Sequence, residues 1–180
     1  MDIVLDIETL GIKPSSVILS IGAVRFDPYS TDPPYDPWYV RLDVDYQLNQ
    51  LGRTVDESTL AWWEKQDPAI RDDALSTDNR ISIDEFSKQF NQYVVGTDCL
   101  WAQGATFDFV LIEDLYRNLG QPSPINYWTI RDSRTLFKST GLDSRKLHNN
   151  GHHNALNDAI AQSVAIQQIY QEFNFERPMG

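Results

Sequence analysis

The sequence predicts a mixed α/β domain with helices packed on one sheet. The chain has 180 residues, a length that suits a single domain, and 41% of them are hydrophobic, which is enough to bury a core. Three strand-like segments come first, and helices then alternate with a further strand. This order of elements is typical of a mixed sheet flanked by helices.

The three N-terminal strands are predicted from their composition. Residues 3–8 resemble a buried strand although they carry two acids, residues 17–26 are rich in β-branched side chains, and residues 38–42 form the third strand. Residues 27–37 contain four prolines in eleven positions. Because proline disrupts the interior of helices and strands, this segment is predicted to be a loop.

Capping signals predict two helices in the middle of the chain. The first would begin at Asp56 or at Thr54 and would include Trp62 and Trp63. A capping box pairs a Ser or Thr with a Glu three residues later, and each satisfies a backbone N–H of the first turn. The two boxes are Thr54–Glu57 and Ser82–Glu85. Apolar residues spaced for one helical face follow the second box.

The C-terminal half predicts one more strand and two helices. Residues 99–102 are a short apolar strand. Residues 109–119 are helical, and Gly120 and Pro122 are stop signals for that helix. Residues 155–170 form the last helix, with apolar side chains spaced along one side.

Composition and charge limit the classes of function. The single cysteine, Cys99, excludes an internal disulfide framework and a multi-cysteine zinc site, and no apolar run is long enough to span a membrane. No signal-peptide pattern is present, so the expected location is the cytoplasm. The net charge of −11 argues at first against a polyanionic partner. Residues 27–85 carry −9 and residues 131–146 carry +3, although both segments also fit solvated faces.

Two acids stand in the first strand. Side chains two apart on a strand share a face, so Asp6 and Glu8 point the same way from a segment that otherwise looks buried. Neighbouring carboxylates repel each other and are costly to remove from water, so a positive group would have to offset them. The alternative is a strand end at which both acids reach water.

Three more polar residues fit the same site. Asp108 stands where a glycine turn leads into a helix, a place that a helix N-cap also explains. Asp158 lies early on the last helix, and His153 stands five residues before it; an exposed helix residue and an exposed loop histidine are the alternatives. Four carboxylates and one histidine form an oxygen-rich set that suits Mg²⁺ or Mn²⁺. Such sets commonly hold two ions about 4 Å apart for phosphoryl chemistry.

In this order, the residues resemble the DEDDh group of 3′–5′ exonucleases, which has the ribonuclease H-like fold. The likeness runs from residue 3 to residue 170 and rests on three motifs: Asp6-Ile7-Glu8-Thr9-Leu10, Phe107-Asp108 and His153-x4-Asp158. Segments 62–66, 104–109 and 131–135 are similar to a branch that includes the exodeoxyribonuclease of T-even phages and bacterial exoribonucleases that trim adenylate tails. Gly104 stands where many members of the group have Asn, as it does in the phage branch.

The resemblance implies roles for the motif residues. Two divalent cations, Mg²⁺ or Mn²⁺, would be the cofactors, and Asp108 would support the second ion. The implied metal ligands are Asp6, Glu8, Asp108 and Asp158. His153 would be the general base, and the five-residue interval to Asp158 favours it over His152. The implied reaction is hydrolysis of the terminal phosphodiester, with release of 5′-mononucleotides from a 3′ end.

The resemblance also implies contacts with the substrate. The residues concerned are Thr9, Leu10, Trp62, Trp63, Phe107, Arg131 and Arg134. Leu10 would wedge against a base or pack at the strand end. Adjacent helical residues point about 100° apart, so one tryptophan is expected in the core and the other at a surface, where it could stack on a base. The arginines would bind phosphate or pair with Asp132 and other acids.

For the whole chain, the resemblance implies one exonuclease domain over residues 1–175, followed by a tail over residues 176–180. The partner would be a 3′ end of single-stranded nucleic acid, with DNA slightly favoured over RNA by the phage-like motifs. Homodimers are common in the group, and a phage or bacterial source is expected. The alternative is a catalytically silent nucleic-acid-binding module of the same fold, against which the complete set of acids argues.

Overall fold

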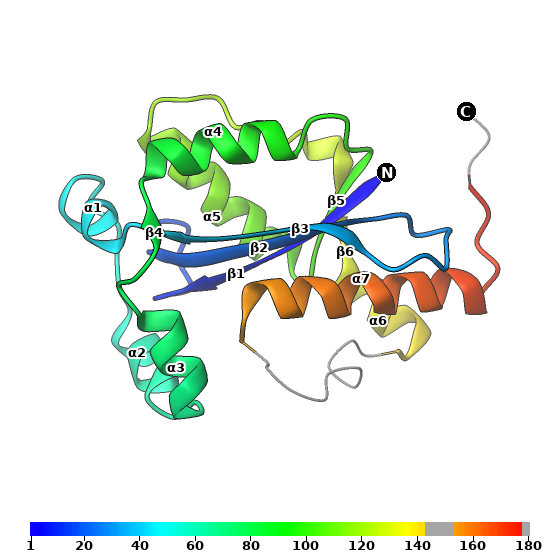
Figure 1. The fold of residues 1–180 in the computed structure, drawn as a ribbon, viewed down its shortest axis with the longest axis horizontal. Helices are drawn as coiled ribbons and strands as arrows, with labels where there is room; N and C mark the ends of the chain where they lie inside the picture. Colours follow the sequence, from blue (N-terminus) through cyan, green and yellow to red (C-terminus); the bar gives the residue numbers. More distant parts are fainter. Residues whose placement is uncertain (143–152, 178–180) are drawn as a thin grey trace.

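A six-stranded mixed sheet forms the centre of the computed structural model, which describes residues 1–142 and 153–177 (Figure 1). The strands lie in the order β4-β3-β2-β1-β5-β6. Their bounds are β1 Asp2–Thr9, β2 Ile18–Phe26, β3 Tyr35–Leu42, β4 Arg80–Ile81, β5 Cys99–Ala102 and β6 Ile130–Asp132. β1, β2 and β3 are antiparallel neighbours, β5 and β6 continue the sheet parallel to β1, and β4 is parallel to β3. The predicted mixed α/β sheet is confirmed.

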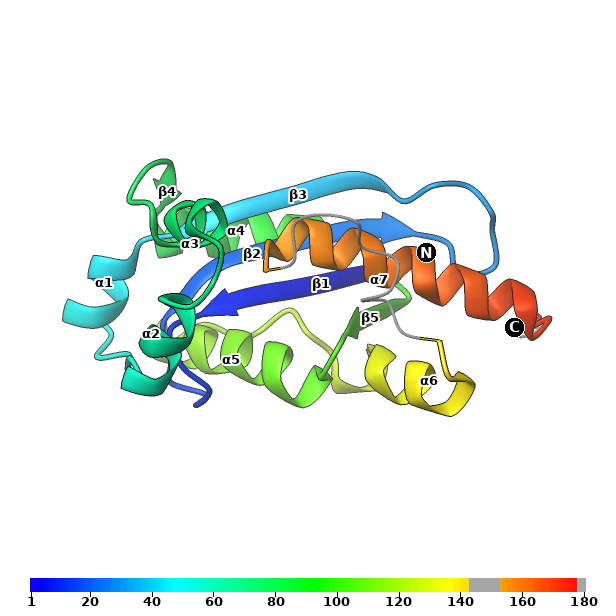
Figure 2. The same cartoon turned by 90° about the horizontal axis from the view of Figure 1, so that it is seen from below.

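Helices cover both faces of this sheet. Their bounds are α1 Val44–Asn49, α2 Glu57–Trp63, α3 Pro68–Leu75, α4 Ile83–Tyr93, α5 Ala105–Asn118, the 3₁₀ helix η1 Tyr127–Thr129, α6 Ser133–Thr140 and α7 Ala155–Glu172. With the sheet seen nearly edge-on, α4 and α5 lie on one side, and α7, α6, α2 and α3 lie on the other (Figure 1). The turned view places α2 beside the C-terminal end of β1 (Figure 2).

The alternation of side chains along β1 separates apolar residues from acids. Ile3 and Leu5 are buried in the hydrophobic cluster that α4 and α5 form with the sheet. Val4 belongs to a second cluster, which lies under α7. Because residues two apart on a strand share a face, Asp6 and Glu8 lie on the same side as Val4. The central strand therefore presents both acids to the face that α7 covers.

A third hydrophobic cluster anchors α2 to the end of β1. Trp63 is fully buried there with Leu10, Val17 and Leu19. Its indole N–H donates a hydrogen bond of 3.0 Å to the carbonyl oxygen of Thr9, the last residue of β1. This polar partner lets the tryptophan be buried without an unsatisfied donor. α2 is thus attached directly to the strand that carries the acids.

Two boundaries differ from the sequence-based expectations. β3 begins at Tyr35, inside the segment predicted to be a loop, and includes Pro37. Pro37 falls at an irregularity of the β2–β3 ladder, between the pairs Ala23–Trp38 and Arg25–Tyr35, and has no paired residue on β2. Proline is tolerated at such interruptions of a strand. α5 begins at Ala105 instead of residue 109, which places Asp108 inside the first turn and not at the cap.

Of the two predicted capping boxes, the one at Ser82 shows its N-cap hydrogen bond, while the Glu85 side chain accepts a hydrogen bond of 2.8 Å from Nε2 of Gln89. The Ser82 hydroxyl accepts a hydrogen bond from the Glu85 N–H at 3.2 Å at the start of α4, which confirms that cap. The box at Thr54 is wrong, because α2 follows Asp56 and the Thr54 backbone bridges to Ser16 instead. The sequence did not predict the short elements β4, β6, α1, α3 and α6. Such short segments contain too few residues to display a period.

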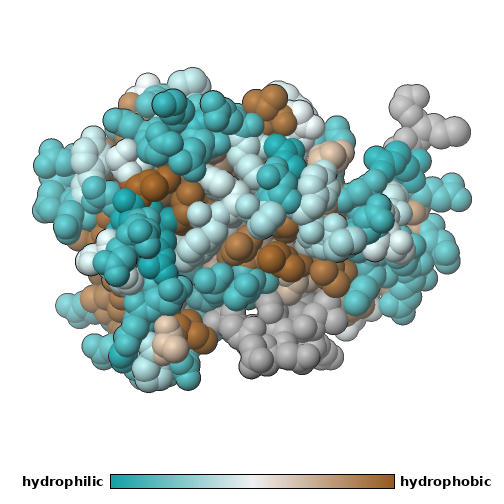
Figure 3. All heavy atoms as spheres, in the orientation of Figure 1, coloured by the Kyte–Doolittle hydropathy of each residue, from teal (hydrophilic) through white to brown (hydrophobic). Residues whose placement is uncertain are grey.

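The surface is largely hydrophilic on the face seen in Figure 3, with hydrophobic side chains visible over α7 and near α2 and α3. On α7, Ile160 and Tyr170 are partly buried and pack against the hydrophobic cluster under that helix. Among the described residues, no helix combines the length and the apolar composition needed to cross a bilayer.

Candidate active site

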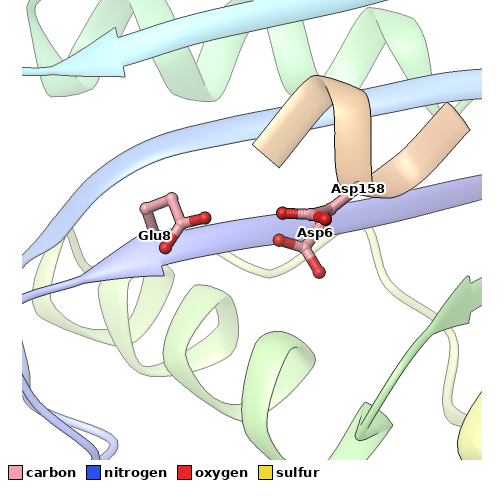
Figure 4. Close-up of side chains that lie close together, drawn as sticks. All are labelled: Asp6, Glu8 and Asp158. Atoms are coloured by element: carbon pink, nitrogen blue, oxygen red, sulfur yellow. The ribbon is translucent and has the colours of Figure 1, made fainter. Parts of the chain in front are cut away.

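Three carboxylates meet where α7 crosses the face of β1. Asp6 and Glu8 come from β1, and Asp158 comes from the first turn of α7. One ligand oxygen from each residue lies within 4.8 Å of the others. Among the described residues, these three acids are therefore close enough to share one metal ion. The carboxyl groups of Asp6 and Asp158 lie side by side, and that of Glu8 points toward them (Figure 4). Glu8 is buried, whereas Asp6 and Asp158 are half-buried.

A glycine in the neighbouring strand lets α7 approach this closely. Gly22 pairs with Asp6 across the β1–β2 ladder and therefore faces α7. A Cβ atom at Gly22 would lie 2.1 Å from the backbone nitrogen of Leu156. The start of the helix is closed by Asn154, whose side chain accepts a hydrogen bond from the Asn157 N–H at 3.2 Å. The absence of a side chain at Gly22 thus sets the distance between Asp158 and β1.

Asp108 comes from α5, in the opposite layer of helices, and its charge raises the pKa values of Asp6 and Glu8. It is 4% exposed and belongs to the first turn of α5. That helix follows Gly104, whose φ of +121° is a conformation that glycine adopts without strain. The N–H of Ala105 donates a hydrogen bond of 2.8 Å to the Asp132 carboxylate, which also caps α6. Asp132 therefore joins the start of α5 to the start of α6.

Burial and mutual repulsion perturb the acids strongly. Burial first, and then the charges of Asp108, Glu8 and Asp158, raise the pKa of Asp6 well above its ordinary value. Burial, followed by the charges of Asp158 and Asp108, raises the pKa of Glu8 to about 8. Burial also raises the pKa of Asp108 to about 7, against backbone hydrogen bonds and the charge of Arg134, which lower it. The protein thus gathers carboxyl groups where their charged forms are poorly solvated and repel one another.

This donor set fits a divalent cation. Carboxylate oxygens are hard ligands of the kind that Mg²⁺ and Mn²⁺ prefer. A cation among Asp6, Glu8 and Asp158 would offset the repulsion that raises the pKa values of Asp6 and Glu8. The oxygen ligands and the repulsion between the carboxylates therefore both favour a divalent cation at this site.

His153 stands at the entrance to α7 with its backbone in the left-handed region. Its φ is +68°, and its N–H donates a hydrogen bond of 2.9 Å to the Asp158 carboxylate. The Trp62 ring meets the imidazole edge to face, with ring centroids 4.7 Å apart. His153 is therefore held between α2 and an acid of the site. The competing histidine, His152, lies outside the described residues.

The two adjacent tryptophans divide as the helical geometry predicts. Trp63 is 1% exposed in the core, whereas Trp62 is 39% exposed and faces the site through His153. Thr9 and Leu10 are both buried. The Thr9 hydroxyl donates a hydrogen bond of 2.7 Å to the Gly11 carbonyl oxygen. Trp62 is thus the more accessible of these residues to a base.

The other expected substrate contacts lie at different places. Phe107 is half-buried and packs against the cluster under α4 and α5. Arg131 is exposed and donates to the carbonyl oxygens of Trp128 and Ile130 at 2.9 and 2.8 Å. Burial raises the pKa of Asp2, at the end of β1 remote from Glu8, and the charge of Arg131 is a minor opposing effect there. Arg134 is closer to the acids, since its charge lowers the pKa of Asp108.

Sequence reasoning missed two residues that shape the site. Gly22 stands amid β-branched residues of a strand, where a glycine signals a close backbone approach. Gln162 follows Asp158 by one helical turn, and its amide N–H donates a hydrogen bond of 3.0 Å to the Asp6 carboxylate. Its position on the same helical face as Asp158 is a signal that the sequence contains.

Comparisons with known proteins agree with this fold. A family model described as the 3′–5′ exoribonuclease Rv2179c-like domain matches residues 1–170. The chain is similar to the solved structure of Exonuclease X in complex with 5′ overhanging duplex DNA, with 18% identity, a TM-score of 0.53 and coverage of 98% of this chain and 95% of that chain. It is also similar to the nuclease domain of 3′hExo, a DEDDh family member, bound to rAMP. Here the identity is 12%, the TM-score is 0.59, and the coverage is 94% of this chain and 91% of that chain. No curated protein matches the chain.

Proposed function

The chain belongs to the family of Rv2179c-like 3′–5′ exoribonuclease domains and is a DEDDh nuclease of the ribonuclease H-like fold, and from this premise we propose how its site works. The proposed reaction is metal-dependent hydrolysis of the terminal phosphodiester at a 3′ end, with release of 5′-mononucleotides. The observation that carries the proposal is the group of three carboxylates within 4.8 Å, together with buried Asp108, whose charge acts on Asp6 and Glu8.

The acids would hold divalent cations, Mg²⁺ or Mn²⁺, two in number. Asp6, Glu8 and Asp158 would hold the first ion, and Asp6 with Asp108 would support the second. When bound, such ions lower the pKa of an attacking water and stabilise the charge that builds on the phosphate. The protein contributes the fixed spacing of the carboxylates, because strand, helix and ladder partners hold each of them.

His153 is proposed as the general base, which would accept the proton of the attacking water. The geometry supports this role, since the backbone of His153 is tied to Asp158 and its ring is packed by Trp62. We expect His153→Ala to lower kcat by about 10²–10⁴-fold. The matched variant is His152→Ala, and a loss confined to that variant would reassign the base.

The proposed substrate is a single-stranded 3′ end. Trp62 would stack on a base, and Thr9, Leu10 and Trp63 would shape or support the same region. Arg134, whose charge acts on Asp108, would bind phosphate. The phage-like motifs favour DNA slightly, and the family description names ribonuclease activity. We therefore expect the protein to shorten both RNA and DNA oligomers of the same sequence. The ratio of the two cleavage rates measures its preference between RNA and DNA.

A digestion experiment tests this function. The full chain is incubated with a 5′-labelled single-stranded oligonucleotide and Mg²⁺, and parallel samples contain EDTA or a 3′-labelled strand. Stepwise shortening of the 5′-labelled strand and early release of a labelled mononucleotide from the 3′-labelled one are expected, with neither in EDTA. No shortening with Mg²⁺ or Mn²⁺ on either DNA or RNA would contradict the proposal and favour the catalytically silent alternative.

A further inference from the structure

Gln162 is a buried amide that faces the acid at the centre of the site. It lies on α7, one turn after Asp158, and is 3% exposed. Its Nε2 donates a hydrogen bond of 3.0 Å to Oδ1 of Asp6. Burying a polar side chain costs free energy unless its donors and acceptors make hydrogen bonds. The contact with Asp6 supplies a partner for the NH₂ group of the Gln162 amide.

Ser133 is the partner of the carbonyl oxygen of the Gln162 amide. Its hydroxyl donates a hydrogen bond of 3.2 Å to Oε1 of Gln162, and the residue is fully buried at the first position of α6. A hydroxyl that donates to Oε1 directs the NH₂ group of the amide toward Asp6, where it can serve only as a donor. The chain of contacts Ser133–Gln162–Asp6 thus has a defined direction.

The position of Asp6 explains why such a donor matters. Asp6 shares its surroundings with three other carboxylates, whose charges repel its own. A hydrogen bond from a neutral amide fixes one oxygen of Asp6 without adding charge to this group of acids. Outer partners of this type orient ligating carboxylates in metal sites.

We propose that Gln162, oriented by Ser133, is a positioning residue that holds the Asp6 carboxylate in the geometry needed to bind a divalent cation. The proposal rests on the proposed function. It also gives a role to Ser133 in the segment 131–135, whose neighbours Asp132 and Arg134 contact Ala105 and Gln103 at the start of α5.

Gln167 on the same helix provides a matched control. It is 7% exposed, and its Nε2 donates hydrogen bonds of 3.0 and 2.9 Å to the carbonyl oxygens of Asp27 and Asp32. Gln167→Met therefore removes a buried amide with two hydrogen bonds from the same helix, but away from the acids. Methionine has similar length and flexibility, so both substitutions fill the space of the amide.

The experiment measures Mn²⁺ binding to the substrate-free full chain by electron paramagnetic resonance, together with kcat, KM and thermal unfolding. For Gln162→Met we expect about 10–100-fold weaker Mn²⁺ binding or lower kcat, with KM for the oligonucleotide within about twofold. Gln167→Met should lose comparable thermal stability and keep the Mn²⁺ affinity and kcat of the wild type. Ser133→Ala should show a smaller loss in the same direction as Gln162→Met, and it carries the test if Gln162→Met does not fold.

Two results would overturn the proposal, and they are distinguishable. If the wild type binds Mn²⁺ and cleaves, and Gln162→Met and Ser133→Ala do both equally well, the positioning role falls while the proposed function stands. If the wild type neither binds Mn²⁺ nor shortens any oligonucleotide, the proposed function is wrong, and the positioning role of Gln162 is wrong as well.

Discussion

Among single residues, Glu8 links the site most directly to stability. Its pKa is about 8 in the folded protein without metal, mainly because it is buried, whereas its ordinary value is 4.5. Between these pH values the folded state keeps a proton that the unfolded chain has released. The stability that this group contributes is therefore fully present below pH 4.5 and is lost as the pH rises toward 8.

Glu8→Gln should consequently stabilise the metal-free protein at high pH. At pH 8.5 in EDTA we expect the free energy of unfolding to increase by at least about 1 kcal/mol, or roughly 2–4 °C in Tm, because the buried charge is gone. At pH 4 the two proteins should unfold at similar temperatures, and Mg²⁺ should stabilise the wild type more than the variant. A variant that is less stable than the wild type at pH 8.5 would contradict this account.

At the scale of elements, the packing of α7 on β2 decides whether Asp158 reaches β1. Gly22→Ala should push α7 away from β2, because the added Cβ would lie 2.1 Å from a backbone atom of α7. A flexible side chain could rotate to relieve such a clash, but a backbone atom cannot. We expect a loss of about 1–3 kcal/mol in unfolding free energy from overpacking, together with weaker Mn²⁺ binding. Denaturant unfolding and metal titration measure the two effects.

Gly52→Ala is the control for this prediction. Gly52 has φ +63° and no atom within 4 Å of an added Cβ, so its substitution strains the backbone without touching the site. It should cost about 1 kcal/mol of stability and leave metal binding unchanged. Metal binding by Gly22→Ala that equals that of Gly52→Ala would show that the helix can shift without consequence for Asp158.

At the scale of the whole molecule, the charge of −11 opposes a nucleic-acid partner until cations are bound. The site itself is negative, and only part of the +3 segment over residues 131–146 lies within the described residues. Two Mg²⁺ ions would bring the formal charge to −7 and would place positive charge where the terminal phosphate is expected. Net charge thus describes the surface better than it describes the site.

Binding of single strands should accordingly depend on metal. With His153→Ala, which should slow cleavage, fluorescence anisotropy is expected to give at least about tenfold tighter binding of an oligonucleotide in Mg²⁺ than in EDTA at physiological salt. The same measurement on Glu8→Gln in Mg²⁺ is the control and should resemble the EDTA result. A nanomolar affinity in EDTA would contradict the proposed role of the cations.

The sequence by itself determined the type of fold and the acids that meet. The alternation of β1 predicted that Asp6 and Glu8 share a face, and the helical geometry of α2 predicted one buried and one exposed tryptophan, because both depend only on the local period of the backbone. Capping and strand boundaries were less predictable, as Thr54 and Pro37 illustrate, because partners from elsewhere in the sheet decide them.

Only the tertiary structure decided how close the acids come and which neutral residues hold them. The role of Gly22 depends on the backbone of α7, more than a hundred residues away in sequence, and the contact of Gln162 with Asp6 joins residues 156 positions apart. Trp62 meets His153 for the same reason, since α2 is fastened to the end of β1 through Trp63. Such contacts have no local period, because packing between distant elements creates them, and they become visible only when the chain is folded.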